Sequence, residues 1–349
     1  MAVAFLVTVT FMFALRPLAQ RVRLVDRPGG RKAHDGDVPI MGGIAMFIGV
    51  FAGLLLIKGA TVLVATLLLA SFLLIVVGVI DDKYSLTASV RMAIQVAAVL
   101  IMFYGSGFQL ADIGDPFGSG VIEMGPFTLV FTIVVSLTVI NAYNLIDGAD
   151  GLAGSLALVA LLAVSFVGGA ADPSTAIALT VSAAVFGFLL FNYPTTWNRP
   201  VRSFMGDAGS TFVGFTILWV VLGASQGADR LVSPVIGLWF ASVPIYDCLT
   251  CFVRRSLKGK SPFAPGRDHF HHVLNRGTTH VRRTIIVLTV LQLLYAAIGL
   301  AGHYAGVPDF VMFGAWALLG LFQRPIIWKL ASFKRWIRMR RHGDRRVST

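Results

Sequence analysis

Residues 61–83 read TVLVATLLLASFLLIVVGVIDDK, twenty residues without a charge followed by Asp81, Asp82 and Lys83. Twenty apolar residues in a helix match the hydrocarbon thickness of a bilayer, so this stretch predicts a transmembrane helix over 61–80. Adjacent carboxylates at a membrane boundary repel each other, and acids at a helix C-terminus also oppose the helix dipole. A solvated helix end is the alternative, but the pattern favours a functional pair that binds a cation.

The composition extends this prediction to the whole chain of 349 residues. It is 56% hydrophobic and only 13% charged, whereas soluble domains carry about 25% charged residues. We therefore expect one integral membrane domain over 1–323, a basic cytosolic tail over 324–349, and little room for a soluble domain. Residues 1–15 lack a basic start and a cleavage site, which predicts a first helix that is retained. Two cysteines cannot build a disulfide framework.

The hydropathy pattern predicts an all-α polytopic membrane protein with about eleven transmembrane helices, which would place the termini on opposite sides. The fourth span is the shortest and is interrupted by Gln95. The expected spans are 1–18, 40–57, 61–80, 90–105, 126–142, 151–168, 174–192, 209–225, 231–251, 283–302 and 307–323.

The positive charges predict the orientation. One set of loops contains 27 of the 29 lysines and arginines, and the other contains only Lys58 and Arg230. Basic loops stay in the cytosol, so the N-terminus is expected outside and the C-terminus inside. The acidic motifs described here then all lie on the cytosolic face. No acid falls near the middle of a span, which argues against a proton-coupled transporter.

The loop after the fifth span, 141–151, reads NAYNLIDGADG and contains Asn144, Asp147 and Asp150. The two aspartates are three residues apart, so a helical turn would place them on one face. They could merely cap the next helix. However, this expected cytosolic loop has no basic residue, so its acids have no partner nearby in the sequence. Oxygen ligands at this density suit Mg²⁺ together with substrate phosphates.

A further acid, Asp207, opens the eighth span in FMGDAGS, residues 204–210. Asp207 with Ser210 could be an N-cap arrangement and nothing more. A helix N-terminus also favours anions, and an aspartate beside glycines could hold a metal above it. Alone the motif is weak, but it gains weight beside the other acids.

The loop after the ninth span is basic and rich in histidine, with Arg267, His269, His271 and His272. Such a segment can bind phosphate or take part in proton transfer. Asp247, near the end of the preceding span, is a weaker site candidate. A zinc site with the nearby Cys248-x-x-Cys251 is an alternative, although His-x-His spacing fits zinc fingers poorly and the cysteines lie inside an expected helix.

The first cytosolic loop contains Arg31, Lys32 and His34 and is followed by Gly42-Gly43. These basic residues could meet a lipid phosphate, although positive-inside anchoring explains Arg31 and Lys32 equally well. The glycine pair favours close helix packing. The chain has no Walker loop and no dinucleotide fingerprint, and its basic segments lie beside the membrane, so nothing suggests nucleic-acid binding.

Taken in order, these motifs resemble those of the polyprenyl-phosphate N-acetylhexosamine-1-phosphate transferases, membrane enzymes that begin bacterial envelope glycan synthesis. The resemblance covers about 27–281. The motifs that carry it are Arg31-Lys32-x-His34 with Pro39-x-x-Gly42-Gly43, Asp81-Asp82, Asn144-x-x-Asp147-Gly148-x-Asp150-Gly151, Gly206-Asp207-x-Gly209-Ser210 and His269-x-His271-His272.

The resemblance implies that a polyprenyl phosphate attacks the β-phosphorus of a UDP-N-acetylhexosamine and releases UMP, on the cytosolic face of the plasma membrane. It implies Mg²⁺, which Mn²⁺ could replace, held by Asp207 with help from Asp82, and Asp81 acting on the lipid phosphate. Asn144, Asp147 and Asp150 would shape the nucleotide and metal pocket, while Arg267 and the three histidines would hold the diphosphate. Homodimers occur among related enzymes.

The His-x-His-His form resembles the branch that transfers N-acetylglucosamine phosphate to undecaprenyl phosphate. The muramoyl-pentapeptide branch carries three consecutive histidines followed by an acid, whereas Phe270 and Val273 stand at those places here. A sister enzyme with that substrate or another UDP-amino sugar remains the main alternative. A lipid-linked sugar transporter would need polar residues along a path through the bilayer, and the expected spans contain few. A membrane scaffold would leave the acidic residues unexplained.

Overall fold

Capping side chains mark the beginnings of several helices. The hydroxyl of Thr61 accepts a hydrogen bond from the backbone N–H of Val64 at 3.3 Å, and Asp172 accepts one from the N–H of Thr175 at 2.6 Å. Ser233 does the same for a third helix, and proline follows both Asp172 and Ser233 at the first helical position. These signals satisfy amides that have no partner within their own helix.

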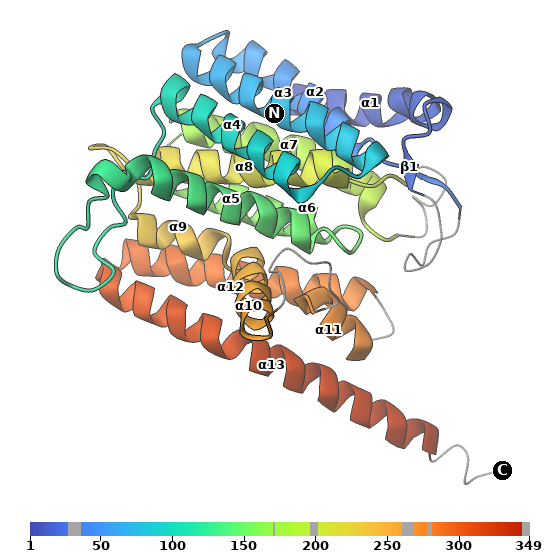
Figure 1. Ribbon diagram of the computed structural model, residues 1–349. Helices are drawn as coiled ribbons and strands as arrows, with labels where there is room; N and C mark the ends of the chain where they lie inside the picture. Colours follow the sequence, from blue (N-terminus) through green and yellow to red (C-terminus); the bar gives the residue numbers. More distant parts are fainter. Residues whose placement is uncertain (27–35, 170–171, 196–201, 260–267, 278–280, 344–349) are drawn as a thin grey trace.

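The computed structural model describes residues 1–26, 36–169, 172–195, 202–259, 268–277 and 281–343, and these are almost entirely helical (Figure 1). Two two-residue strands, β1 (Val25–Asp26) and β2 (Val38–Pro39), pair antiparallel. The helices are α1 (Ala2–Arg21), α2 (Gly42–Lys58), α3 (Val62–Tyr84), α4 (Ala88–Ser106), the short 3₁₀ helix η1 (Gly125–Phe127), α5 (Thr128–Ile146), α6 (Leu152–Val167), α7 (Pro173–Asn192), α8 (Gly206–Ser225), α9 (Pro234–Phe240), α10 (Ser242–Leu257), α11 (Phe270–Gly277), α12 (Val281–Tyr304) and α13 (Asp309–Gly343).

Each of the eleven expected spans coincides with a helix or with a pair of helices. Within the described residues, eight helices are long and apolar enough to cross a membrane, and a bent pair brings the number to nine. The helices α2 and α6 are apolar but shorter than the others. The chain is therefore a polytopic membrane protein, while the count of eleven and the orientation remain predictions.

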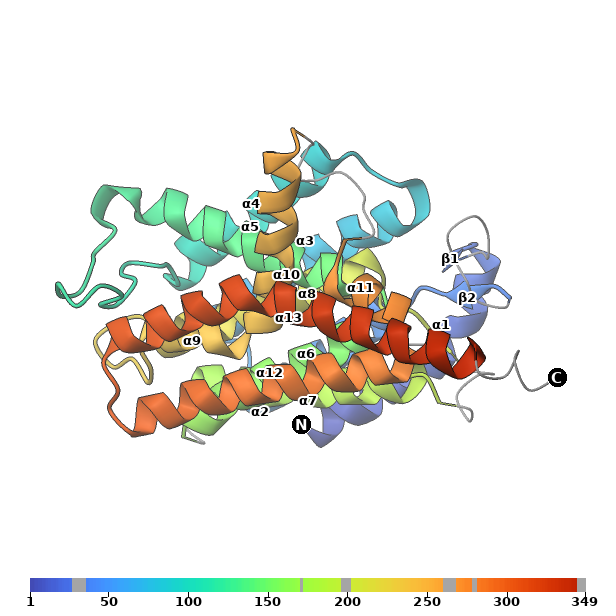
Figure 2. The same cartoon turned by 90° about the horizontal axis from the view of Figure 1, so that it is seen from below.

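One expected span is not a straight helix. The segment predicted as 231–251 breaks at Ala241, and α9 and α10 enclose an angle of 88°. Figure 2 shows α10 turned across the helices on either side of it, while α9 lies along them. The expected boundary at residue 323 falls inside the single helix α13, so the separate tail remains a prediction.

The helix α8 forms the centre of the bundle. It packs against α3, α5, α2, α7 and α6, and it is the most deeply buried of the candidate spans (Figure 1). Glycines bring its first turns against two neighbours. A Cβ on Gly43 of α2 would strike the backbone of Gly209, and a Cβ on Gly78 of α3 would strike the backbone of Ala208. Three helices therefore meet backbone to backbone at this end of the bundle.

The segment before α2 is joined to the segment before α8. Phe204 donates its N–H to the carbonyl of Pro39 at 3.0 Å and accepts one from Gly42 at 3.0 Å. Gly43 donates to the carbonyl of Met205 at 3.2 Å. These bonds hold the start of α8, where Asp207 lies, against the segment that leads into α2.

Candidate active site

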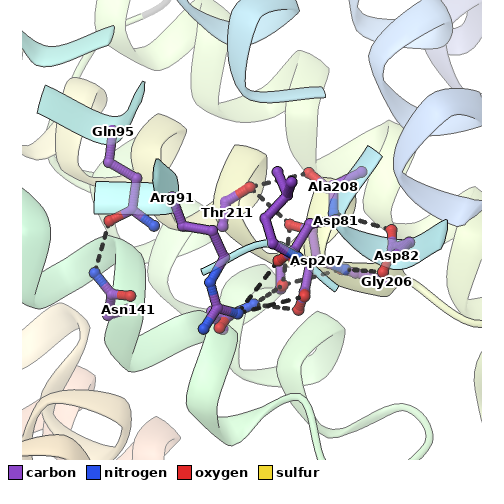
Figure 3. A network of polar contacts seen from close by, with 12 residues as sticks. Asp81, Asp82, Arg91, Gln95, Asn141, Gly206, Asp207, Ala208 and Thr211 are labelled. Carbon is purple, nitrogen blue, oxygen red and sulfur yellow. Dashed lines mark hydrogen bonds and ion pairs between the residues drawn. The ribbon is translucent and has the colours of Figure 1, made fainter. Parts of the chain in front are cut away.

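Acidic residues from two helices meet where α3 ends and α8 begins (Figure 3). Asp81 and Asp82 occupy the last turns of α3, and Asp207 occupies the first turn of α8. The two oxygens of Asp82 accept hydrogen bonds from the backbone N–H groups of Asp207, at 2.8 Å, and Ala208, at 3.3 Å. Asp82 therefore caps α8 from another helix, a role that sequence spacing could not reveal.

The residue before Asp207 must be a glycine for this arrangement to form. Gly206 has φ +73°, in the left-handed region that L side chains rarely adopt. A Cβ on Gly206 would also strike Ile40 and the carboxylate of Asp82. The Gly-Asp pair thus lets the carboxylate of Asp82 approach the helix end.

Asp207 is further held by a side chain from α5. Asn144 donates from Nδ2 to Oδ1 of Asp207 at 2.7 Å and to the hydroxyl of Ser210 at 3.0 Å. The expectation that Asn144 belongs with the acidic residues therefore agrees with the geometry. Ser210 does not cap the helix, since its hydroxyl donates to the carbonyl of Gly206 at 3.0 Å.

A cation that the motif reading missed lies between these carboxylates. Arg91, in the first turns of α4, places Nη1 3.2 Å from Oδ2 of Asp81 and 3.7 Å from Oδ2 of Asp207 (Figure 3). The other oxygen of Asp81 accepts the N–H of Leu86 at 2.7 Å. The sequence contained Arg91 only as one of many loop cations, and nothing in its spacing marked it.

The loop after α5 separates its two aspartates. Asp147 ends α5, where burial and the charges of Asp207 and Asp82 raise the pKa of its carboxyl well above the usual value. Asp150 instead forms an ion pair with Arg202. The expectation that a helical turn holds both on one face is wrong, because the chain turns at residues 148–151. The partner of Asp150 comes from a segment distant in the sequence, so the loop itself supplies no basic partner, as expected.

The side chains border two hollows. A small one is lined by Asp81, Arg91, Asn144 and Asp207, together with Gln95 and Asn141. Asn141 donates to Gln95 at 2.7 Å, which explains how α4 accommodates a buried glutamine. A larger cavity of about 720 Å³ lies between α4, α5 and α10 and shares Arg91, Asn141 and Asn144 with the first.

The histidine motif reaches the larger cavity. His269, His271 and His272 all line it together with Asp147 and Gly148. His271 is 1% exposed, and neither of its ring nitrogens has a hydrogen-bond partner among the described residues. Burial, with smaller effects from His272 and His269, lowers the pKa of His271 to about 3, so its ring stays neutral. A buried ring without partners suits a ligand that supplies them.

Four of the expected site residues, Arg31, Lys32, His34 and Arg267, lie outside the residues that the structure describes. Asp268 forms an ion pair with Arg254 at 2.8 Å, with both side chains partly exposed. Burial alone would raise its pKa, but the arginines nearby lower it.

The acidic residues are suited to a divalent cation. Asp81 and Asp207 each present a carboxylate oxygen to the small hollow, and Arg91 is the cation that contacts them among the residues the structure describes. Carboxylates that lie this close together repel each other unless a cation neutralises their charge. Both oxygens of Asp82 accept backbone hydrogen bonds, and those of Asp81 are engaged by the N–H of Leu86 and by Arg91. Asp207, whose side chain is 37% exposed, is therefore the most accessible ligand of the three.

Comparisons with known proteins identify the relatives of this chain. Residues 64–225 match Glycosyl transferase family 4. The chain is 34% identical to the undecaprenyl-phosphate alpha-N-acetylglucosaminyl 1-phosphate transferase of Escherichia coli O157:H7, over 97% of this chain and 95% of that protein. It is 32% identical to the protein of the same name from Pasteurella multocida, over 99% of this chain and 97% of that one.

Proposed function

Because the chain belongs to glycosyl transferase family 4 and is a membrane-embedded sugar-1-phosphate transferase, we propose that it transfers N-acetylglucosamine 1-phosphate from its UDP derivative to undecaprenyl phosphate. The lipid phosphate attacks the β-phosphorus, a new P–O bond forms, and the bond to UMP breaks. The product is a polyprenyl-diphospho-sugar. We place this reaction at the cytosolic face of a bacterial inner membrane.

The observation that supports this proposal is the shared border between a polar hollow and a large, mostly apolar cavity. Arg91 and Asn144 line both. The mostly apolar cavity between α4, α5 and α10 suits a lipid chain. The acidic hollow suits a metal ion, which would in turn bind phosphate oxygens. Two anions must approach each other in this reaction, which requires positive charge around them.

The chain's own residues divide the work as follows. Arg91 neutralises charge where the lipid phosphate meets the carboxylates, and Asp81 orients that phosphate. Asp207, held by Asn144, would be the main ligand for Mg²⁺, and Asp82 fixes the backbone at the start of α8. Mg²⁺, or Mn²⁺ in its place, would lower the electrostatic repulsion between the reacting phosphates.

The histidines complete the proposed site. His271 and His272 form part of the cavity wall, against which the diphosphate of the sugar nucleotide would lie. The neutral ring of His271 can donate one hydrogen bond to it and accept another. Arg267 is assigned to the same anion from the motif alone. The pairing of Asp150 with Arg202 gives Asp150 a structural task in the loop that carries Asp147.

The sugar is the finer part of the proposal. The His-x-His-His form and the relatives named above favour N-acetylglucosamine. The muramoyl-pentapeptide derivative is the second candidate, because the same phosphate chemistry would serve it. A homodimer remains a prediction from the family resemblance.

The test is UMP release by detergent-purified protein supplied with undecaprenyl phosphate and Mg²⁺. We expect lipid-dependent release with UDP-N-acetylglucosamine, none with UDP-N-acetylmuramoyl-pentapeptide, and loss of release with EDTA or in Asp207→Ala. Release with the second substrate alone would keep the reaction and overturn the sugar. Folded protein that releases UMP from neither substrate would overturn the proposal.

A further inference from the structure

Asp247 lies in the interior of the protein, on α10, and both of its oxygens are engaged. It is 1% exposed. Its Oδ2 lies 2.8 Å from Nδ1 of His269, and its Oδ1 accepts the backbone N–H of Phe270 at 2.7 Å. A single carboxylate therefore holds both the first histidine of the motif and the first residue of α11.

The contacts of the ring define the tautomer of His269. Nη2 of Arg255 lies 3.3 Å from Nε2 of His269. A guanidinium can only donate hydrogen bonds, so Nε2 must accept. The proton of a neutral ring then sits on Nδ1 and points at Asp247, whose carboxylate can only accept. Asp247, His269 and Arg255 form a chain in which every donor meets an acceptor.

A metal site is the rival interpretation of this cluster. Asp247, Cys251 and His269 present ligand atoms within 4.8 Å of one another, and all three residues are buried. However, the 2.8 Å between Oδ2 and Nδ1 is a hydrogen-bond distance, and the positive charge of Arg255 adjoins the same ring. Both observations favour the hydrogen-bonded chain over a bound cation.

The chain connects a residue outside the cavity with residues in its wall. His269 and Arg255 line the large cavity together with Asp147 and Asn144, whereas Asp247 does not. Asp247 can therefore affect a ligand there only through its neighbours. Outer carboxylates that orient a histidine are a recurring device in enzyme sites.

We propose that Asp247 is a positioning residue of the transfer reaction, which fixes the Nδ1–H form of His269 and through that ring places Arg255 against the diphosphate. This inference rests on the proposed function for its effect on activity. Its statement about the tautomer stands on the geometry alone.

The decisive variant is Asp247→Asn. The amide oxygen can still accept the N–H of Phe270, so α11 keeps its anchor, while the amide NH₂ faces Nδ1 and favours the opposite tautomer of His269. We expect kcat to fall about 10- to 100-fold, the range seen when outer partners of a functional histidine are removed. KM for the UDP-sugar should change by less than about threefold, because a group that only positions the reacting atoms lowers kcat and leaves substrate binding unchanged.

A double-mutant cycle separates positioning from a general folding effect. If Asp247 acts through the ring, Asp247→Asn in a His269→Ala background should lower kcat no further. Independent, multiplying losses would overturn the proposal. The matched control is Asp268→Asn, one residue before His269, whose carboxylate faces Arg254 outside the cavity and whose loss should leave kcat within about twofold.

Nitrogen-15 NMR of histidine-labelled protein tests the tautomer without any activity. His269, assigned by its loss in His269→Ala, should carry its proton on Nδ1 in the parent chain and on Nε2 in Asp247→Asn. A parent ring protonated on Nε2 would overturn the proposal even if UMP release is normal. Parent protein that is inactive but has the Nδ1–H ring would instead contradict the proposed function alone.

Metal analysis addresses the rival directly. We expect purified protein to contain no stoichiometric zinc. Cys251→Ser should retain its kcat, since the thiol lies 3.5 Å from Nδ1 of His269, whereas the carboxylate of Asp247 lies at 2.8 Å and is the acceptor of the ring proton. Zinc at one equivalent, lost in both Cys251→Ser and Asp247→Asn, would replace the positioning role with a metal site.

Discussion

The carboxylate of Asp82, at the end of α3, accepts the backbone N–H of Asp207, at the start of α8, over 2.8 Å. One acidic residue thus satisfies the helix end on which the other acidic residue stands. An acid near a helix N-terminus also interacts favourably with the helix dipole. The two acidic residues are therefore joined by a stabilising contact, and this contact gives Asp82 a role in stability as well as in the site.

Asp82→Ala removes this cap from α8. We expect its free energy of unfolding to fall by about 0.5–2 kcal/mol, the range for lost N-caps. Asp82→Asn should lose less, because an amide oxygen still accepts one of the two N–H groups. Thermal unfolding in detergent with EDTA present measures this. Equal melting temperatures for Asp82→Ala and the parent chain would contradict the capping role.

Arg91→Ala should lower kcat/KM for UMP release by at least about 100-fold, the loss expected for one charge-stabilising group. Asp81 and Asp207 would lose the cation that contacts both. Arg91→Lys should recover part of this loss, because a lysine keeps the charge but not the planar fork. The control is Lys83→Ala, because Lys83 is an exposed cation in the last turn of α3 and lies over the ring of Tyr84 instead. Equal effects of the two alanine variants would refute the assignment.

The raised pKa of Asp147 predicts a dependence of stability on pH. The folded protein holds this proton more tightly than the unfolded chain, so its relative stabilisation is complete below the unfolded pKa of about 3.9 and is lost as pH rises towards the folded pKa. Asp147→Asn lacks this titration. In EDTA, the melting temperature of the variant minus that of the parent chain should increase from pH 4 to pH 8. A difference in melting temperature that stays constant or falls would show that the pKa of Asp147 is not raised.

Gly148→Ala tests the contact between the loop after α5 and the histidine motif. A Cβ at this position would strike Nε2 of His271, so the ring must move. We expect kcat to fall by about tenfold or more, since displacement of a positioning group by about 1 Å can cost 100-fold. Gly169→Ala is the control, because a Cβ there meets nothing within 4 Å. Normal kinetics in Gly148→Ala would mean that the position of His271 does not matter.

The sequence was informative about the helices and about residue types. Runs of about twenty apolar residues fix where the long helices lie, and eight of them meet the length and composition of a span. Gln95 interrupts the apolar sequence of the fourth expected span, but it is accommodated in α4 because Asn141 donates a hydrogen bond to its side chain. The bend at Ala241 was missed because hydropathy is averaged over a window of residues and carries no information about the direction of the helix axis.

The site was predicted only in part, for a physical reason. Acidic motifs can be read from local sequence, but most partners of these carboxylates come from elements distant in the sequence. Asp150 pairs with Arg202, and Arg91 reaches across to Asp207. These pairings depend on how the helices pack, so spacing along the chain could not distinguish Asp147, which faces the acidic site, from Asp150, which does not.

The backbone contacts of Gly43 and Gly78 with the first turns of α8 have a consequence for the reaction itself. With no side chain between them, the three helices have no room to slide or rotate past one another. The carboxylates that they carry are held at fixed separations before any substrate arrives. Their mutual repulsion is therefore overcome once, when the protein folds, and not again in each turnover, which is the condition of electrostatic preorganisation.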